Sequence, residues 1–390
     1  MTADPALAAA LVASAREHDG PPAEVETVVR AGRVGPLLQL ARHHRMVPFV
    51  HRDLRRIPGA DTRTLQVLDR HEITQTANQM RIVTDLAGFE ASIAPVEIPW
   101  ITFKGPVAAQ LLYGRPELRT YRDLDVLVPR ADFRRTVAFL QRSGVEVIDR
   151  NWTLISREQR GQLHVTLPLG TVADLHWHLL NRGVVREAFT VDMEGVLARA
   201  RTVTISGTRV RTLGTADTLV HLGLHSALAG GDRLIWLKDI ERAIAVEEPD
   251  WDEVVERALA WRAGAALAVM LRRAAVALEA DVPVWVARDL DPSGTRRRVG
   301  EVVDRRWPTS AATGDASPAW FWPQLVRDGR LATIGSILQR SVRRPASAVH
   351  QLLGEPGGGG RDHEPAAVLH PSGGDAVRER YLRELGDEEG

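Results

Sequence analysis

Two aspartates separated by a single residue stand at the start of a short apolar segment. The segment Tyr121-Arg-Asp-Leu-Asp-Val-Leu-Val128 has Asp123 and Asp125 in its first half and apolar residues in its second half. Residues i and i+2 of a β-strand face the same way, so the two carboxylates are expected side by side, with Leu124 and Val126 in a core. Adjacent, partly desolvated carboxylates repel each other and require a cation. Mg²⁺ binds carboxylate oxygens and keeps positions for substrate phosphates, so the pair indicates phosphoryl or nucleotidyl chemistry.

A third carboxylate follows on a later segment with the pattern of a strand. If residues 172–178 are extended, Asp174, His176 and His178 share one face. Three carboxylates can hold two ions about 3.5–4 Å apart, one for the attacking hydroxyl and one for the triphosphate. His176 is expected to orient Asp174 or to contact substrate. The alternative is that these acids have a structural role, since Asp-x-Asp pairs are also common at solvated edges and in turns.

The segment Thr102-Phe-Lys-Gly-Pro106 predicts a strand that ends in a turn before a helix. Lys104 is a natural point charge for a triphosphate, and Gly105 allows a close approach of the backbone. Arg119 can bind phosphate oxygens through two N–H groups. The alternative is that Lys104 is an exposed turn lysine, that Gly105 is a conformational necessity, and that Arg119 neutralises the acids.

Hydrophobic periodicity predicts the elements around these residues. Residues 1–93 are expected to be helical, and residues 145–155 to form one or two strands. The other predicted strands are 96–103, 122–128, a hairpin of 162–167 with 172–178, and a second hairpin within 202–213. The other predicted helices are 106–113, 132–142, 215–229, 233–245 and one that begins at Asp250.

The predicted fold class is therefore α+β, with a small mixed sheet between N-terminal and C-terminal helical regions. Four consecutive parts are expected: a helical region over 1–93, an α+β core with a hairpin extension over 94–213, a mainly helical region over 214–350, and a Gly- and Pro-rich disordered tail over 351–390.

Several of these motifs, in this order, resemble the uncharacterised branch of the polymerase-beta-type nucleotidyltransferases. The motifs are Lys104-Gly105, Arg119 to Val128, Asp174-Leu-His-Trp177, Leu219-Val-His-Leu-Gly-Leu-His225 and Leu234-Ile-Trp-Leu-Lys-Asp239. The resemblance covers about residues 75 to 280 and does not extend to either end. The superfamily's usual Gly-Ser or Gly-Gly turn is Lys-Gly here, which is a trait of this branch and leaves open how the triphosphate is held.

The resemblance implies a nucleotidyltransferase core at about residues 94–185. It would move a nucleoside monophosphate from an NTP, ATP by default, to an unknown hydroxyl group and release pyrophosphate. Asp123 and Asp125 would hold one or two Mg²⁺ ions, with Asp174 as third ligand or as general base. The acceptor is a small molecule, a peptide or a protein. The alternatives are a degenerate nucleotide-binding or regulatory module, or a tailoring enzyme of a bacterial biosynthetic cluster.

Outside the core, the histidines, Asp239 and the arginines are expected to have structural roles. His221 and His225 have a spacing that can bind zinc, but a packed helical pair is the favoured reading. Asp239 is expected to be a cap or ion-pair partner, with contact to substrate as the alternative. Arg296 to Arg298, with Arg305 and Arg306, suggest a solvated basic helix face.

Composition excludes several classes of protein. The charges of the 50 basic and 50 acidic residues cancel, so the chain lacks the net positive charge that is typical of nucleic-acid-binding proteins. The chain has no cysteine, which excludes disulfides and thiolate metal sites. No signal peptide and no apolar stretch of about 20 residues is evident, so a cytoplasmic protein without a membrane segment is expected.

Overall fold

A computed structural model describes residues 4–292, 294–306 and 366–386 of the chain. The contacts between these residues group the chain into two units. One unit consists of Met1–Glu72 and Thr218–Gly360, and the other of Ile73–Asp217 and Arg361–Gly390. The first and last helical regions thus fall into one unit, and the grouping follows contacts rather than four consecutive stretches of sequence.

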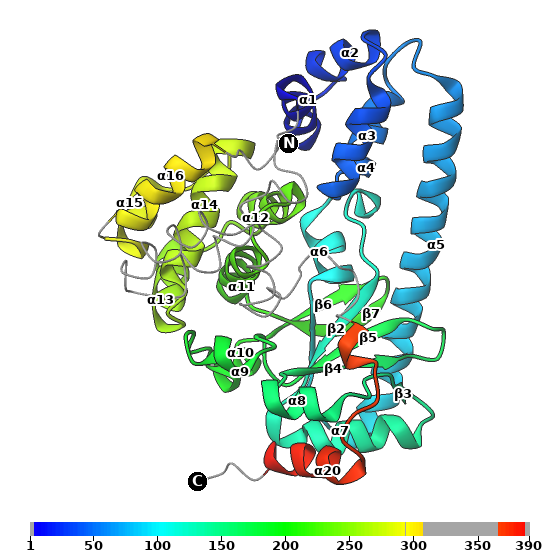
Figure 1. Cartoon of the computed structure of the whole chain (residues 1–390), viewed down its shortest axis with the longest axis vertical. Helices are drawn as coiled ribbons and strands as arrows, with labels where there is room; N and C mark the ends of the chain where they lie inside the picture. The colour runs from blue at the N-terminus through cyan, green and yellow to red at the C-terminus, as the bar shows by residue number, and fades with distance from the viewer. Residues whose placement is uncertain (1–3, 293, 307–365, 387–390) are drawn as a thin grey trace. The chain divides into compact units, whose positions relative to one another are not determined.

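The second unit is built on a five-stranded sheet with the order β1-β2-β5-β4-β3, of which β2 to β5 are labelled in Figure 1. Its strands are β1 (Ile101–Phe103), β2 (Asp123–Leu127), β3 (Glu146–Val147), β4 (Gln162–Thr166) and β5 (Val172–His176). Strands β2 and β5 pair in parallel, and the other neighbours pair antiparallel. The sheet is therefore mixed, and the predicted α+β class is confirmed.

One face of this sheet is apolar and forms the core of the unit. Alternate residues of the three central strands belong to it: Leu124 and Val126 of β2, Ala173 and Leu175 of β5, and Leu163 and Val165 of β4. They share a cluster with α5 (Thr62–Ile93) through Ile82, Leu86 and Phe89, and with α7 (Arg130–Arg142) through Phe133, Val137 and Leu140. Because strand side chains alternate, the residues between these apolar ones project from the other face.

The remaining elements of this unit are short. The helices are α6 (Gly105–Leu112), α8 (Trp152–Glu158), α9 (Gly183–Arg186), α10 (Met193–Ala198) and α20 (Asp375–Glu384), and the 3₁₀ turns are η1 (Ala94–Val96), η2 (Pro116–Leu118) and η6 (Ala366–Val368). Strands β6 (Arg201–Ile205) and β7 (Thr208–Thr212) form a separate antiparallel hairpin. This hairpin is the one predicted within residues 202–213.

Two of the strand predictions differ from the structure by several residues. The first strand begins at Ile101 rather than at residue 96, because η1 occupies 94–96 and Glu97 is left-handed with φ of 53°. The prediction of strands over 145–155 is wrong in its second half. There, β3 ends at Val147 and α8 begins after Asn151, whose side chain accepts a hydrogen bond from the Leu154 amide as an N-cap.

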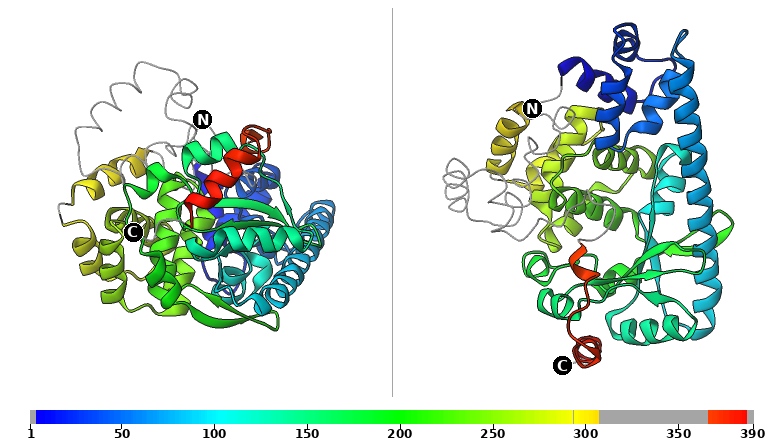
Figure 2. Two further views of the ribbon diagram at one scale, coloured as in Figure 1. Left: turned by 90° about the horizontal axis from the view of Figure 1, so that it is seen from below. Right: turned by 45° about the vertical axis from the view of Figure 1, so that its right-hand side comes forward.

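Part of the expected disordered tail is folded. Residues 351–365 lie outside the described residues, but η6 and α20 follow, and α20 packs against α7 and α8 (Figures 1 and 2). Tyr381 and Leu382 are 4% and 2% exposed, and Leu385 is also buried. Burial raises the pKa of the Tyr381 phenol to about 12. The phenol bonds to the Arg160 carbonyl, and the Trp177 indole N–H donates to it over 3.1 Å.

The other unit is helical in its described residues. Its helices are α1 (Pro5–Ala15), α2 (Ala23–Arg30), α3 (Val34–His43), α4 (Val47–Leu54), most of α11 (Thr215–Leu228), α12 (Leu234–Glu247), α13 (Trp251–Ala260), α14 (Gly264–Leu278), α15 (Val284–Leu290) and α16 (Thr295–Arg306). The first turns of α5 also belong to it. Asp250 caps α13 by accepting the Asp252 and Glu253 amides, as its position before the helix predicts.

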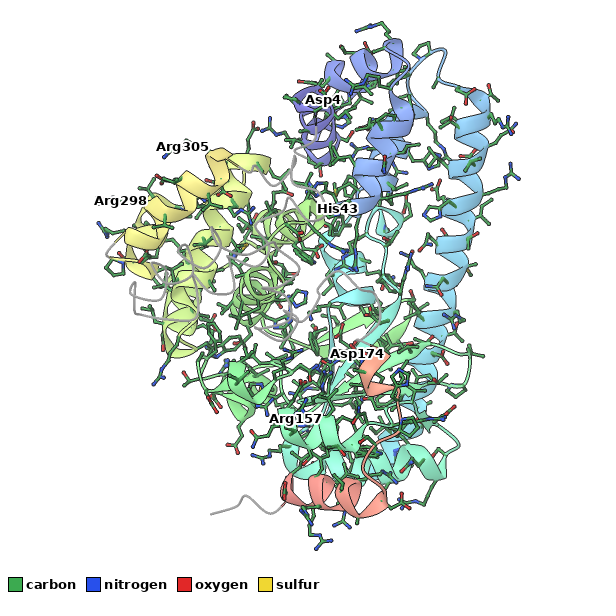
Figure 3. All side chains as sticks on the ribbon, in the orientation of Figure 1. Asp4, His43, Arg157, Asp174, Arg298 and Arg305 are labelled. Carbon is green, nitrogen blue, oxygen red and sulfur yellow. The ribbon has the colours of Figure 1, made fainter. Side chains whose placement is uncertain are left out.

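The predicted basic helix face falls on α16, where Arg298 is exposed (Figure 3). The side chains of Arg296, Arg297 and Arg306 are outside the described residues. Among the described residues, no helix combines the length and apolar character that crossing a bilayer requires.

The buried face of α20 gives a test of the folded tail. Replacing Leu382 with Ala leaves a cavity beside α7 and α8 and should lower the free energy of unfolding by about 2–5 kcal/mol, measured in urea. The matched control is Arg380→Ala on the exposed side of the same helix, which should change it by less than about 0.5 kcal/mol. Equal effects of the two substitutions would contradict the docking of α20.

Candidate functional site

Two carboxylates face each other across the centre of the sheet. Asp125 of β2 and Asp174 of β5 are register partners in the parallel pair, and Figure 3 labels Asp174 on its strand. Their neighbours Leu124, Val126 and Leu175 lie in the apolar core, so both acids project from the opposite face. The side chains of Asp125 and Asp174 are 8% and 18% exposed. Two nearly buried acids on adjacent strands need hydrogen-bond donors or a cation to remain charged.

An imidazole joins this pair. His176 lies two residues after Asp174 on β5, and its Nε2 is 3.0 Å from Asp125 Oδ1. The His176 ring also lies against Phe103, with 5.3 Å between ring centroids. One potential ligand atom each of Asp125, Asp174 and His176 lies within 4.8 Å of the others. The two carboxylates of this group are the kind of oxygen donor that a divalent cation takes, and the imidazole lies beside them as a hydrogen-bond partner.

Asp123 is displaced by two residues along the strands from the register pair of Asp125 and Asp174. It is the first residue of β2, is half-buried and pairs with Val172, the first residue of β5. Alternation places it on the face of Asp125, but among the described residues it is outside the group formed with Asp174 and His176. The structure therefore brings Asp125, Asp174 and His176 together and leaves Asp123 at the neighbouring strand end.

Strand β4 contributes polar residues that the sequence analysis did not single out. His164 is the register partner of Asp174, and Gln162 is that of His176. The Gln162 amide nitrogen lies 3.2 Å from Asp174 Oδ2, and His164 Nδ1 lies 2.8 Å from Asp149 Oδ1. The signal in the sequence is the alternation of Gln162 and His164 with apolar residues in a strand beside the one that bears Asp174.

Lys104 occupies a strained turn between β1 and α6. Its φ and ψ are 56° and −139°, a combination that costs energy for a residue with a side chain. Its carbonyl accepts the Ala108 amide over 2.8 Å and so starts α6, and its Nζ lies 5.4 Å from the centroid of the Phe103 ring. The Lys104 ammonium thus lies beside an aromatic ring that also contacts His176.

Gly105 packs directly on the strand of the acids. Its φ is positive at 27°, and a Cβ atom there would lie 3.2 Å from the carbonyl oxygen of Asp123 and 3.8 Å from the Tyr121 ring. Burial raises the pKa of the Tyr121 phenol to about 12, so this side chain is uncharged where it packs beside Gly105. The absence of a side chain at Gly105 is what lets the turn approach β2 so closely.

Arg119 precedes β2 in the segment after η2. Its carbonyl accepts the Gln79 amide of α5 over 3.1 Å, and its Nη1 donates to the Thr120 carbonyl over 3.2 Å. The side chain is half-buried. These bonds fix the backbone at Arg119, while phosphate binding by its guanidinium stays a prediction.

The predicted residues of the other unit form separate groups. Asp239 lies on α12 and is 1% exposed. The rings of His221 and His225 stack with centroids 6.0 Å apart, and His225 meets the Trp236 ring edge-on. The two histidines therefore form part of an aromatic cluster.

In a second group of potential metal ligands, an arginine side chain already pairs with the carboxylates. His51 of α4 lies 2.9 Å from Asp69 and 3.3 Å from Glu72 of α5. The Arg55 guanidinium lies 2.6 Å and 3.0 Å from the same two carboxylates. Because Arg55 already balances these charges, the group is explained as an ion-pair network.

The sequence matches a family described as uncharacterised nucleotidyltransferases over residues 32–279. The match reaches further toward the N-terminus than the resemblance found in the motifs, which begins at about residue 75. No curated protein matches the chain.

Two solved structures are similar to parts of the chain. The antibiotic-resistance factor ANT(2'')-Ia has 13% identity and a TM-score of 0.31, with 47% of this chain and 91% of that chain covered. An antigenic nucleotidyltransferase-like protein from Paracoccidioides brasiliensis has 18% identity and a TM-score of 0.34, with 54% and 96% covered. Both TM-scores are low, so neither likeness bears on individual residues of the site.

The contact between Gly105 and β2 predicts a stability effect. Gly105→Ala forces a left-handed conformation on a residue with a side chain, and the free energy of unfolding should fall by about 1–2 kcal/mol. Its Cβ also presses on the Asp123 carbonyl. The control is Gly88→Ala on α5, where a Cβ meets nothing within 4 Å and should stabilise the helix by about 0.5–1 kcal/mol. Urea unfolding of both variants measures the difference, and a neutral Gly105→Ala would contradict the close packing.

Proposed function

The chain belongs to the family of uncharacterised nucleotidyltransferases, and on that premise we propose the following reaction. A hydroxyl oxygen of an acceptor attacks the α-phosphorus of a nucleoside triphosphate, and a phosphoester bond forms. The bond from the α-phosphorus to its bridging oxygen breaks, and pyrophosphate leaves. The proton of the hydroxyl passes to a base at the site.

The observation that supports this proposal most directly is the pairing of Asp125 with Asp174 across β2 and β5. Both acids are on the polar face of the sheet, and the turn of Lys104 and Gly105 lies close to the same strand, since a Cβ atom at Gly105 would be 3.2 Å from the Asp123 carbonyl oxygen. A structural role alone would not explain why the sheet places two acids in register, because two apolar residues at these positions would cost less free energy to bury.

Asp123, Asp125 and Asp174 are the proposed ligands for one or two Mg²⁺ ions. Within the group of Asp125, Asp174 and His176, the two carboxylates offer oxygen ligands for such an ion, while His176 donates its Nε2 hydrogen to Asp125 and so stands outside the ligand set. When bound, Mg²⁺ supplies positive charge against the charge that develops on the phosphates. Asp123, the first residue of β2, would bind the ion from the side on which the turn of Lys104 and Gly105 lies.

The two facing acids are proposed to have different tasks. Asp125 is held by His176 and is the more buried, so it acts as a fixed ligand. Asp174 is the more exposed, so it meets the acceptor hydroxyl as third ligand or as general base. His176 positions Asp125 by donating an N–H to its Oδ1.

The phosphates are assigned to the turn and to the segment before β2. Lys104 provides a point charge, Gly105 permits close approach of the backbone, and Arg119 provides a guanidinium. The nucleotide is an NTP, with ATP as the default, and the acceptor is a small molecule, a peptide or a protein.

Replacing either facing acid should abolish transfer. In Asp125→Asn and Asp174→Asn, Mg²⁺-dependent pyrophosphate release with each of the four NTPs should fall by at least about 100-fold, because charge at the reacting centre is lost. Intact mass in the same samples shows whether a nucleotide is added to the protein itself. The control is Glu146→Gln, which removes an exposed carboxylate from the edge strand β3.

Full release in both Asp variants would contradict the assignment of the acids. Mg²⁺-dependent NTP binding without release by the wild-type protein would instead favour a degenerate module, or an acceptor that the assay does not supply. A binding titration with the same nucleotides separates these outcomes from a protein that binds no NTP.

A further inference from the structure

The side of Asp174 that faces β4 is lined by hydrogen-bonding groups. Asp174 lies between β2 and β4, with Asp125 as its register partner on one side and His164 on the other. The side chains of His164 and Gln162 project from the same face of β4 as Asp174 does from β5. Both residues are buried, at 6% and 8% exposure. Buried polar groups require hydrogen-bond partners.

Asp149 fixes His164 at two points. Its Oδ2 accepts a hydrogen bond from the backbone N–H of His164 over 2.9 Å, and its Oδ1 accepts one from the ring Nδ1 over 2.8 Å. The Asp149 side chain is 1% exposed. A carboxylate only accepts hydrogen bonds, so His164 Nδ1 carries a hydrogen, and in the neutral ring Nε2 presents a lone pair. The tautomer and the direction of the ring are thus set by Asp149.

The amide of Gln162 connects this ring to the candidate catalytic acid. Its Nε2 lies 3.4 Å from His164 Nε2 and 3.2 Å from Asp174 Oδ2. An amide nitrogen has two hydrogens, one for each of these acceptors. The reverse orientation would set the amide oxygen against two acceptors, so the contacts select a single orientation.

We propose that Asp149, His164 and Gln162 form a positioning chain for Asp174, and we call it the β4 chain. It runs from the Asp149 carboxylate through the imidazole and the amide to Asp174 Oδ2. His164 Nε2 also lies 3.5 Å from Asp174 Oδ1, and the Gln162 amide is the donor shared by these two acceptor groups. The chain holds the Asp174 carboxylate in one orientation opposite Asp125. This inference rests on the proposed function, because the orientation of Asp174 matters only if it binds the ion or the acceptor.

The β4 chain complements the bond between His176 and Asp125. Each facing acid has its own hydrogen-bond donor: Asp125 has the His176 imidazole of β5, and Asp174 has the Gln162 amide of β4, with the His164 ring 3.5 Å away. Outer partners of this kind commonly change metal affinity by about 10–100-fold when they are removed. If the β4 chain had only a structural role, removing one of its members would lower the stability of the sheet and leave the metal affinity unchanged.

The test uses Mn²⁺ as a probe of the site, with binding followed by electron paramagnetic resonance. His164→Asn keeps an amide donor near Asp149 but removes the acceptor at Nε2, and it should weaken Mn²⁺ binding by about 10–100-fold. His164→Gln can place an amide oxygen near the lost Nε2, and it should recover most of that affinity. Equal binding by wild type and His164→Asn would overturn the inference.

A matched control separates positioning from stability. Asp85 of α5 is also buried and accepts two backbone amides, those of Leu169 and Thr171 at 3.0 Å and 3.1 Å, in the turn between β4 and β5. Asp85→Asn should lower the midpoint of thermal unfolding and leave Mn²⁺ affinity unchanged. Loss of affinity in Asp85→Asn as large as in His164→Asn would assign the effect to the sheet and overturn the inference.

The imidazole tautomer provides a readout that does not depend on metal binding. ¹⁵N NMR of histidine-labelled protein should show hydrogen on Nδ1 of neutral His164, with the signal identified by its loss in His164→Asn. Hydrogen on Nε2 would overturn the β4 chain even if wild type binds Mn²⁺. Failure of the wild-type protein to bind Mn²⁺, with the Nδ1 tautomer present, would contradict the proposed function and leave the hydrogen-bonded chain as a structural feature.

Discussion

The structure depends on one electrostatic constraint: two acids share the polar face of a small sheet, on strands that are directly hydrogen-bonded. Asp125 and Asp174 cannot separate, because the parallel register of β2 and β5 holds them opposite each other. Two unit charges about 4 Å apart repel by about 4 kcal/mol at an effective dielectric constant of about 20. That energy is comparable with the whole stability of a domain, about 5–15 kcal/mol. The surrounding groups are arranged to offset it.

The opposite face of the same strands provides the energy that keeps this arrangement folded. Leu124 and Leu175 are next to the acids in sequence but lie in the core with α5 and α7. A shift of one residue in the pairing would move the acids into this core and the apolar residues out of it. The apolar face therefore fixes the register, and the register places Asp125 opposite Asp174. The stability of the sheet and the geometry of the site are specified by the same pairing.

The sequence predicted the parts of this site that depend on local alternation. The spacing of Asp123, Asp125 and Asp174 within apolar segments was sufficient to place each acid on one face of a strand. It could not show that Asp174 lies opposite Asp125 while Asp123 lies at the strand end, because register is set by contacts between distant segments. His164 was not predicted for the same reason, since its role depends on the pairing of β4 with β5.

The folded tail was missed for a different physical reason. The helix α20 is rich in Arg and Glu, and its apolar side is reduced to a few residues, of which Tyr381, Leu382 and Leu385 are buried. Such a short apolar pattern stabilises a helix only when a surface is available to cover it. That surface comes from α7 and α8, which lie more than 200 residues earlier in the chain. Local composition therefore predicted disorder where tertiary packing produces a helix.

The surroundings of the two facing acids differ in a way that bears on their chemistry. Asp125 has an imidazole partner at 3.0 Å and an 8% exposed side chain, whereas Asp174 has an amide partner at 3.2 Å and an 18% exposed side chain. A charged group that is more buried and held by an imidazole has less freedom to exchange partners during a reaction. An acid with greater access to solvent can release one contact and accept another. The asymmetry therefore favours Asp125 as the permanent ligand and Asp174 as the residue that meets the acceptor.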